Sequence, residues 1–260
     1  MKHISSRDNA TFKTLRALAE SSRERRKQHK TLLDGMHLVA AYCARYGAPE
    51  ILALSESGLN IPEIRAFLDA HPAMETLVFA DVLFGEISPV AGPTGILAAI
   101  ATPPAPATRE LAKSCVLLDA IQDPGNMGSI LRSAAAAGIE DVFLSAGCAI
   151  AWSPRVLRAA MGAHFTLRIH EHAILETLLA NFPGSRICAS LRGGQTLYDL
   201  DLTGPVAWLF GNEGAGLSTE LEALADHAVV IPMPGGAESL NVAAAAAVCL
   251  FEEVRQKVSH

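Results

Sequence analysis

The stretch CVLLDAIQDPGNMGSILRSAAAAGI, residues 115–139, passes from one apolar pattern to another. Its first six residues form a short apolar run, which is typical of a strand buried on both faces. The tetrad DPGN, residues 123–126, follows and predicts a sharp turn, because all four residue types are common in turns. An amphipathic helix is then expected to begin at Gly128, with Arg132 one turn inside it. Taken alone, the stretch is better explained by an ordinary turn followed by an exposed arginine.

The same alternation of short apolar runs and helices continues to the end of the chain. Further strands are predicted at residues 166–170, 186–190, 206–210, 228–232 and 141–145, and further helices at residues 154–162, 172–181 and 241–256. Nearly continuous apolar strands separated by helices are typical of a parallel sheet covered on both faces. In such α/β sheets ligands bind where the carboxyl ends of the strands pass into loops.

The first hundred residues predict a smaller α/β layer structure. Residues 11–28 are expected to form one helix, with Phe12, Leu15 and Leu18 on its apolar stripe. Short strands are predicted at residues 31–34, 50–55, 75–80 and 95–100, and a helix at residues 36–46.

Three prolines in TPPAPATR, residues 102–109, indicate an interdomain linker. A chain of 260 residues also suits two modest domains better than one. We therefore expect an N-terminal domain at 1–102, a linker at 103–109 and a C-terminal domain at 110–260.

Composition points to a folded protein without a membrane span. Half of the residues are hydrophobic, and the mean hydropathy is +0.26. The longest apolar run, Val242 to Phe251, is about half of what a membrane helix requires. Met1 is followed by polar and charged residues, which is not typical of a secretory signal. These features predict a cytoplasmic protein with no membrane partner.

Cysteines and histidines give no sign of a metal or disulfide framework. The five cysteines are far apart and form no CxxC pair, and the nine histidines are scattered. We expect reduced, mostly buried thiols and no metal.

The positive charge is concentrated at the N-terminus. The whole chain carries a net charge of −6, but residues 1–30 hold nine Lys and Arg against three acidic residues. A concentrated basic patch can bind phosphates even on an acidic protein. Candidate RNA contacts are Arg23, Arg25, Arg26 and Lys27. A solvated helix face is an equally good interpretation of these residues.

A second loop, GNEGAGLS at residues 211–218, follows the apolar run 206–210. Its spacing matches a phosphate-binding loop, but Leu217 stands where that motif requires lysine. The overlapping stretch GAGLST, residues 214–219, begins like a dinucleotide fingerprint, but Thr219 replaces the last glycine. The glycines thus indicate that the chain needs backbone freedom at the end of this strand, where Asn212 and Glu213 could face a ligand. The alternative is a glycine-rich turn that only reverses the chain.

A third loop lies in IPMPGGAESLNVAAAAAVCLF, residues 231–251. Ser239 or Asn241 can cap the following helix, but a cap explains only one of them and not Gly235-Gly236. Three polar loops after three strands of one sheet make a shared ligand site the better interpretation.

The three stretches resemble, in order and spacing, the motifs of SpoU/TrmH-type RNA 2′-O-ribose methyltransferases of the SPOUT superfamily. DPGNMGSILR supplies an Asn and an Arg six residues apart, Asn126 and Arg132. GNEGAGLS matches the second motif, and IPMPGGAESLNVAAAAA matches the third. The resemblance covers residues of about 115–257. The N-terminal part more loosely resembles the substrate-binding module of the family, through LLDGMHLV and GPTGILAAI.

The resemblance implies a fold and a cofactor that the residue patterns alone do not. It implies a parallel-sheet domain with a deep trefoil knot, preceded by a small α/β, L30e-like substrate-binding domain, and a homodimer with the site near the subunit interface. S-adenosylmethionine is the implied cofactor, held by Gly211, Asn212, Ile231, Met233 and Leu240.

The implied reaction is methyl transfer to a ribose 2′-hydroxyl of RNA, with ribosomal RNA expected before tRNA. The implied catalytic residues are Arg132, Asn126, Ser239, Asn241 and Glu213. A guanidinium rarely acts as a base, since its pKa lies above about 12. We therefore expect Arg132 to bind the phosphate beside the target ribose and to polarise the hydroxyl.

Two other function classes remain open from the sequence. The α/β pattern alone also suits a dinucleotide-dependent oxidoreductase. This chain, however, lacks the complete GxGxxG turn that is typical of that class. A non-catalytic RNA-binding protein on a methyltransferase scaffold is the other alternative. The intact set of five polar motif residues argues against it.

Overall fold

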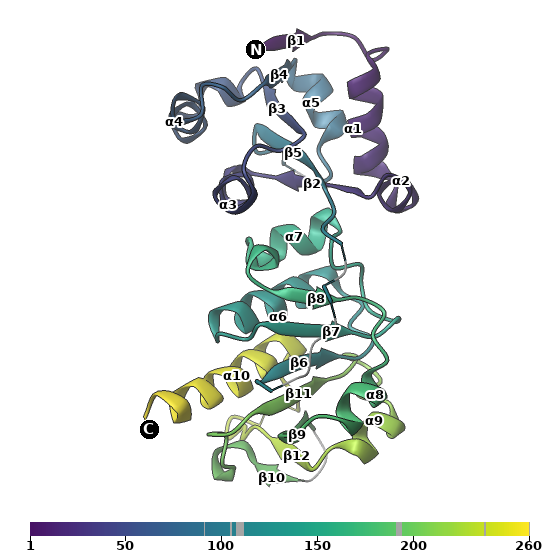
Figure 1. Cartoon of the computed structure of the whole chain (residues 1–260), viewed down its shortest axis with the longest axis vertical. Helices are drawn as coiled ribbons and strands as arrows, with labels where there is room; N and C mark the ends of the chain where they lie inside the picture. Colours follow the sequence, from purple (N-terminus) through teal and green to yellow (C-terminus); the bar gives the residue numbers. More distant parts are fainter. Residues whose placement is uncertain (91, 105, 108–111, 191–193, 237, 260) are drawn as a thin grey trace. The chain divides into compact units, whose positions relative to one another are not determined.

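The computed structural model describes residues 1–90, 92–104, 106–107, 112–190, 194–236 and 238–259 (Figure 1). The chain divides into two compact units. Unit 1 comprises Met1–Pro104 and Trp152–Phe165, and unit 2 comprises Ala105–Ala151 and Thr166–His260. Part of the expected linker at 103–109 lies outside the described residues. The segment Trp152–Phe165 packs with unit 1 although it lies within the sequence range of the second expected domain.

Unit 1 is a five-stranded mixed sheet with helices on both faces. The strand order is β1 (Lys2–Ile4), β4 (Thr76–Phe79), β3 (Ile51–Ser55), β5 (Ile96–Ala101), β2 (Lys30–Asp34). The strand pairs β1–β4 and β3–β4 are parallel, whereas β5 runs antiparallel to β3 and β2. Its helices are α1 (Ala10–Glu20), α2 (Ser22–Gln28), α3 (Met36–Tyr46), α4 (Pro62–Ala70), α5 (Asp81–Ile87) and α7 (Pro154–Ala160).

The two faces of this sheet bury separate apolar clusters. Side chains alternate along β2, so Leu32 joins the cluster that contains Phe12 and Leu15 of α1, while Leu33 joins the cluster that contains Leu157 of α7. The predicted stripe on the first helix is confirmed, because Phe12, Leu15 and Leu18 are all buried. The strands predicted at 31–34, 50–55, 75–80 and 95–100 are also present.

The single helix predicted over residues 11–28 is wrong. Ser21 takes an extended conformation (φ −123°, ψ 114°) that ends α1. Its hydroxyl accepts a hydrogen bond from the Glu24 amide at 3.2 Å and thereby caps α2. The two serines at 21–22 therefore separate two helices. The charge pattern of the residues that follow hides this break in the sequence.

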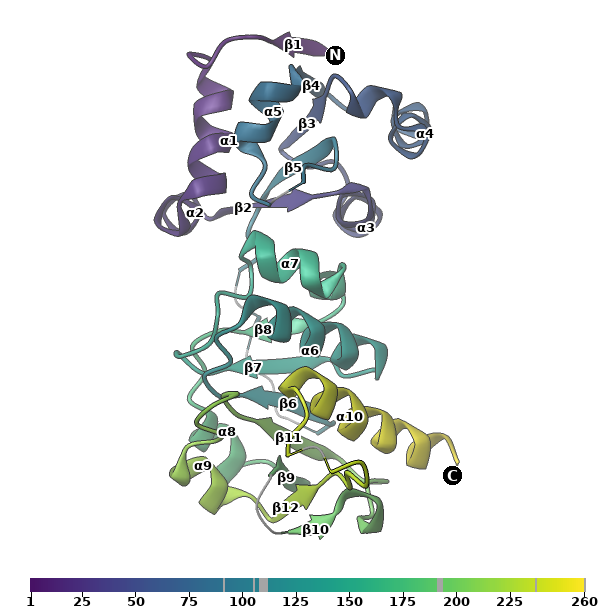
Figure 2. The same ribbon diagram turned by 180° about the vertical axis from the view of Figure 1, so that it is seen from behind.

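Unit 2 is a parallel sheet, as the sequence predicts, and it has seven strands where six were predicted. The strand order is β10 (Gln195–Thr196), β12 (His227–Val230), β9 (Ser185–Ala189), β11 (Val206–Phe210), β6 (Cys115–Leu118), β7 (Asp141–Leu144), β8 (Arg168–His170). Helices α6 (Pro124–Ala136) and α10 (Val242–Val258) lie side by side on one face, and α8 (Leu175–Ala180) and α9 (Thr219–Leu224) cover the other (Figures 1 and 2). Strand β10 and helix α9 were not predicted.

The predicted turn at residues 123–126 is also wrong. Pro124, Gly125 and Asn126 form the first turn of α6, so the helix begins four residues before Gly128. Asp123 is its N-cap, and the carboxylate accepts a hydrogen bond from the Asn126 amide at 2.8 Å. Proline at the first helical position is favourable because its missing N–H would have no partner there. The turn-forming tetrad is thus a helix start.

Polar bonds fix α10 against the sheet. The buried Trp208 indole of β11 donates to the Glu253 carboxylate at 2.5 Å. The Gln256 amide accepts from the Leu202 backbone at 2.8 Å and donates to the Leu200 carbonyl at 3.0 Å. Since these partners hold the C-terminal half of α10, the N-terminus of the helix is also fixed in place.

Within the described residues, no helix is both long and apolar enough to cross a membrane. The knot stays a prediction.

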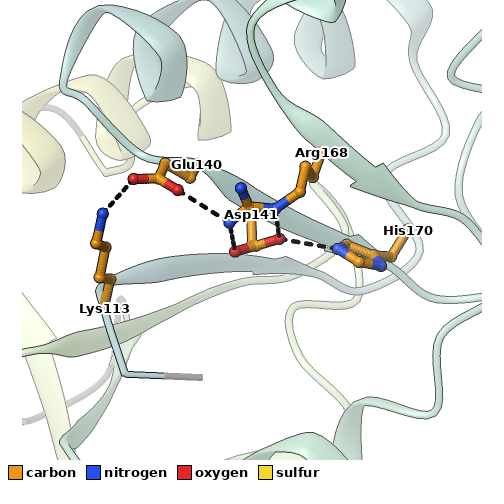
Figure 3. Close-up of polar contacts among 5 residues, drawn as sticks. All are labelled: Lys113, Glu140, Asp141, Arg168 and His170. Carbon is orange, nitrogen blue, oxygen red and sulfur yellow. Dashed lines mark hydrogen bonds and ion pairs between the residues drawn. The ribbon is translucent and has the colours of Figure 1, made fainter. Parts of the chain in front are cut away.

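An ionic network joins β7 and β8 (Figure 3). Asp141 accepts from the Arg168 guanidinium at 2.8 Å and is bonded to the His170 ring nitrogen at 2.9 Å, while Lys113 and Arg168 bind Glu140. Burial alone raises the pKa of Asp141. The bonds from His170 and Arg168 outweigh burial and hold its pKa at about 2, below the ordinary 3.8. Asp141 and Arg168 begin their strands, so we assign this network to stability.

We expect Asp141→Asn to lower the free energy of unfolding by about 2 kcal/mol at neutral pH, because a shift of one pKa unit corresponds to about 1.4 kcal/mol. The folded-state pKa is depressed, so this contribution is complete above the ordinary pKa and is lost as the pH falls through about 2. Denaturant unfolding at pH 7 and below pH 4 measures it. Asp8→Asn is the control, since the Asp8 side chain is 94% exposed. An equal effect of both substitutions would contradict the assignment.

Candidate active site

The three predicted loops meet at the side chain of Asn126. Its amide nitrogen donates to Glu213 Oε1 at 2.6 Å, and its oxygen accepts from Asn241 Nδ2 at 2.8 Å. Asn126 belongs to the helix after β6, Glu213 to the loop after β11, and Asn241 to the end of the loop after β12. The structure therefore confirms that residues far apart in the sequence converge at the carboxyl side of the sheet.

The orientation of each amide in this chain follows from the N-terminus of α10. Asn241 Oδ1 accepts from the backbone amides of Ala243 at 2.9 Å and Ala244 at 3.4 Å. Backbone amides only donate, so Asn241 must point its NH₂ group at Asn126. Asn126 then points its own NH₂ group at Glu213, and the Glu213 carboxylate accepts this hydrogen bond. The helix end thus fixes three side chains in sequence.

The loop after β11 is closed by its own backbone. Asn212 and Gly216 exchange two backbone hydrogen bonds of 2.9 Å, and Gly216 has a positive φ of 77°. A Cβ on Gly211 would lie 2.3 Å from the backbone of Gly216 and Leu217, so only glycine fits at that position. Glu213 is carried at the exposed tip of this closed loop.

The Asn212 side chain braces this loop from within. Its oxygen accepts from the amides of Gly214 at 2.9 Å and Ala215 at 3.0 Å, and its nitrogen donates to the Ala120 carbonyl at 2.9 Å. All three side-chain bonds are made to backbone groups, so the side chain fixes the loop against the end of β6. The sequence predicted Asn212 as a ligand contact, and the structure gives its side chain a positioning task.

Two residues at the end of β6 position the site but were not predicted. Asp119 accepts from the Ser218 amide at 3.2 Å and so holds the far end of the glycine loop. Ala120 has a left-handed backbone (φ 52°), which is unfavourable for a residue with a Cβ. Its amide donates to Ser145 Oγ at 3.0 Å. A carboxylate directly after a buried strand was the available signal for Asp119, whereas nothing in the sequence marks Ala120.

The loop after β12 turns at Gly236. Its amide donates to the Met233 carbonyl at 3.2 Å, and its φ of 76° favours glycine. Leu240, just before Asn241, is 37% exposed, which leaves an apolar side chain open beside the polar cluster. Ser239 is exposed and makes no hydrogen bond within the described part of the chain.

Arg132 is not part of the Asn126 cluster. Six residues at 3.6 per turn place it about 120° around α6 from Asn126. The side chain is exposed, and it forms no hydrogen bond or ion pair with any residue that the structure describes. The predicted set is therefore divided into an ordered cluster (Asn126, Glu213 and Asn241) and two free groups, Arg132 and Ser239.

The basic residues of α2 differ in their surroundings. Arg23, Arg26 and Lys27 are exposed. The Arg25 guanidinium donates to the carbonyls of Leu18 at 2.6 Å and Ala19 at 3.3 Å, at the end of α1. Burial, and to a smaller extent Arg26, lowers the pKa of Arg25 below its ordinary value. Arg25 therefore joins two helices, and the other three cations are available to a ligand.

Comparison with known proteins identifies the class. The family model of the SpoU rRNA methylase family matches residues 113–251. An uncharacterized tRNA/rRNA methyltransferase of Synechocystis sp. is 34% identical, with 98% of this chain and 94% of the relative covered. The 23S rRNA (guanosine(2553)-2′-O)-methyltransferase RlmP of Bacillus subtilis is 32% identical, with 96% and 98% covered. The AdoMet complex of the SpoU methyltransferase AviRb from Streptomyces viridochromogenes has a TM-score of 0.82 at 28% identity, covering 96% of this chain and 99% of that one.

These matches identify the parallel α/β sheet and its three polar loops as those of a SpoU/TrmH-type methyltransferase. The chain belongs to the SpoU rRNA methylase family, whose model matches more than half of it. The predicted activity, that of an S-adenosylmethionine-dependent RNA 2′-O-methyltransferase, is confirmed at the level of the family. Nothing in these comparisons supports the oxidoreductase alternative.

Asn241 allows its two tasks to be separated. We expect Asn241→Asp to keep the helix cap, and hence the free energy of unfolding, because the carboxylate still accepts from Ala243 and Ala244. It cannot donate to Asn126, so methyl transfer should fall about tenfold or more. Asn241→Ala is the matched variant and should also lose about 1 kcal/mol of stability. Thermal unfolding and a methyl-transfer assay measure both. Full activity in Asn241→Asp would exclude any catalytic use of the bond to Asn126.

Proposed function

We propose that the protein methylates a ribose 2′-hydroxyl of ribosomal RNA. The observation that carries the proposal is the hydrogen-bonded cluster through which Asn126 joins all three motif loops. The names of the curated relatives favour ribosomal RNA over tRNA, since RlmP of B. subtilis is a 23S rRNA 2′-O-methyltransferase. A tRNA substrate is the second candidate.

The loops after β11 and β12 have the character of an adenosyl site. S-adenosylmethionine, when bound, supplies a methyl group that the positive sulfur makes electrophilic. Gly211 and Ile231 would hold it through their backbone, and the half-buried Met233 and the exposed Leu240 offer apolar surface. Asn212 would act by keeping the glycine loop closed. The fit of S-adenosylmethionine would rest on the rigid glycine loop at Gly211 on one side and on the apolar side chains of Met233 and Leu240 on the other.

The protein's main contribution to catalysis is alignment and activation of the ribose hydroxyl. A hydroxyl is a very weak acid, so a nearby charge that stabilises the oxyanion accelerates transfer. Arg132 would bind the phosphate beside the target ribose and lower the pKa of the hydroxyl. Its freedom from partners among the described residues supports this task, because no ion pair has to be broken.

The ordered cluster would hold the ribose rather than move its proton. Asn126 already donates to Glu213, and Asn241 already donates to Asn126, so their geometry is fixed before RNA arrives. The second carboxylate oxygen of Glu213 stays available to accept from a ribose hydroxyl. Ser239, which is exposed beside Leu240, would supply one further hydrogen bond.

We also propose a homodimer formed through α10. Phe251 and Val258 lie on one side of this helix, seven residues apart, and are 47% and 81% exposed. An exposed apolar stripe of this kind is typical of a buried interface. A sedimentation mass of one chain at micromolar concentration would contradict the dimer. The trefoil knot and the cytoplasmic location are proposals that rest on the resemblance and on composition.

The reaction is tested with labelled S-adenosylmethionine and unmodified ribosomal RNA or tRNA, followed by nucleoside mass spectrometry. We expect a labelled 2′-O-methylnucleoside from ribosomal RNA. Arg132→Ala should lower the rate about 10²-fold or more. Arg132→Lys distinguishes charge from shape: recovery by lysine supports a purely electrostatic task, and no recovery supports a geometric one. Cofactor binding without any transfer would instead favour the non-catalytic alternative.

The free cations of α2 are tested by salt dependence. We expect the triple variant Arg23→Gln/Arg26→Gln/Lys27→Gln to weaken RNA binding and to reduce the slope of log affinity against log salt by about 2, at about 0.7 per phosphate contact. Arg7→Gln/Arg16→Gln is the control, because both arginines are paired with Glu86 in unit 1. An unchanged slope in the triple variant would show that α2 is only a solvated helix face.

A further inference from the structure

Unit 1 contains a cavity of about 310 Å³ that the methyl-transfer site does not use. It lies where β2 passes into α3, and α4 and α7 form its walls. This volume is at the lower end of the range for small-molecule sites. The apolar lining is contributed by Met36, Ile61, Ile64 and Met161. Ile61 and Met161 are 39% and 40% exposed, so two large apolar side chains of the cavity stay open to solvent.

A buried carboxylate lines the same cavity. Asp34 is 4% exposed; its Oδ2 accepts from Ser88 Oγ at 2.8 Å and its Oδ1 from Thr94 Oγ1 at 3.0 Å. Each oxygen has two lone pairs, so each keeps one further acceptor site. Asp34 forms no ion pair with any cation that the structure describes, and a buried carboxylate without a cation is unfavourable. The two hydroxyl groups satisfy only part of its capacity to accept hydrogen bonds.

Arg158 supplies a positive charge on the rim. It belongs to α7 and lines the cavity, and it is exposed and unpaired within the described residues. Its charge is near enough to act on Asp34 but does not form a salt bridge with it. The cavity thus combines the buried carboxylate of Asp34 with apolar side chains, and its exposed lining includes the cation Arg158 and the carboxylate Glu63.

An unpaired guanine has the chemistry that matches this arrangement. Among the standard bases, only guanine presents two neighbouring N–H donors, N1–H and N2–H, on its Watson–Crick edge, which a carboxylate can accept as a pair. Its ring face suits the isoleucine and methionine side chains, since methionine sulfur packs favourably on aromatic rings. The rim arginine suits the phosphate of the same or the next nucleotide.

We propose that this cavity binds an unpaired guanine of the RNA substrate, with the Asp34 carboxylate accepting from N1–H and N2–H. This inference rests on RNA being the substrate and assigns unit 1 a base-reading task. The pocket reads sequence, whereas the cations of α2 would contact the RNA backbone irrespective of sequence.

Methionine methyl groups allow a direct test. The chain has six methionines, of which Met36 and Met161 line the cavity, Met233 lies in the proposed cofactor site, and Met127 is buried in unit 2. The full-length protein, labelled at the methionine methyls, is titrated with the RNA trinucleotide UGU and followed by NMR. We expect saturable shifts at Met36 and Met161 and none at Met127. S-adenosylmethionine should shift Met233 instead.

Base identity is tested with UIU and UAU. Inosine lacks the 2-amino group, so UIU should bind about tenfold more weakly or worse, and UAU should not saturate. No shift at Met36 and Met161 at millimolar UGU would overturn the site. Equal binding of all three trinucleotides would overturn the guanine assignment. Neither result depends on methyl transfer, so failure here is distinct from failure of the proposed reaction.

Two variants complete the test. Asp34→Asn should abolish the preference for UGU over UIU, and its thermal unfolding shows whether the fold is kept. Arg158→Gln changes only the exposed rim and should weaken UGU binding severalfold. Arg155→Gln is its matched control, because Arg155 is exposed on the same helix but does not line the cavity. Equal loss in Arg155→Gln and Arg158→Gln would overturn the role of the rim arginine.

Discussion

The free amides at the start of α10 are the constraint on which the candidate active site depends. They only donate, so they dictate which way Asn241 points, and Asn241 dictates the orientation of Asn126. Glu213 receives the last hydrogen bond of this series. A helix cap, which in most proteins only stabilises a helix, here sets the geometry of a cluster drawn from three loops. Stability and preorganisation are therefore coupled at one residue.

The parallel sheet makes this convergence possible. Carboxyl ends of parallel strands lie at one edge, so loops from distant parts of the sequence meet there without a long connection. The opposite ends of the strands carry a different kind of polar structure. Asp141 and Arg168 neutralise one another on adjacent strands, and their strong mutual perturbation reflects structure rather than chemistry. The Asn126 cluster lies at the carboxyl ends of the strands and the Asp141 network at their amino ends. This position distinguishes a candidate active site from a stabilising network better than the size of a pKa shift does.

Sequence patterns predicted the parallel sheet, the positions of six of its strands along the chain and the convergence of the three loops. They failed where a local pattern had two physical outcomes. Residues 123–126 suit a turn, but Pro124 also suits the first position of a helix, and Asp123 was available as its cap. The two serines at 21–22 interrupt a charged helix because Ser21 caps the second half. The cavity at Asp34 was not predictable, since Arg158 reaches unit 1 only through the tertiary packing of α7.

The division of the motif residues into an ordered and a free group has a mechanistic reason. In the proposed mechanism Asn126, Asn241 and Glu213 hold a neutral ribose. Hydrogen bonds to neutral groups depend strongly on orientation, so the conformational entropy of these side chains is best lost during folding. In the same proposal Arg132 meets a phosphate, and a charge acts over a longer distance with less angular demand. A guanidinium that was already paired would have to exchange one carboxylate for the phosphate, with little gain. Because Arg132 has no partner among the described residues, the whole of its charge would be kept for the RNA.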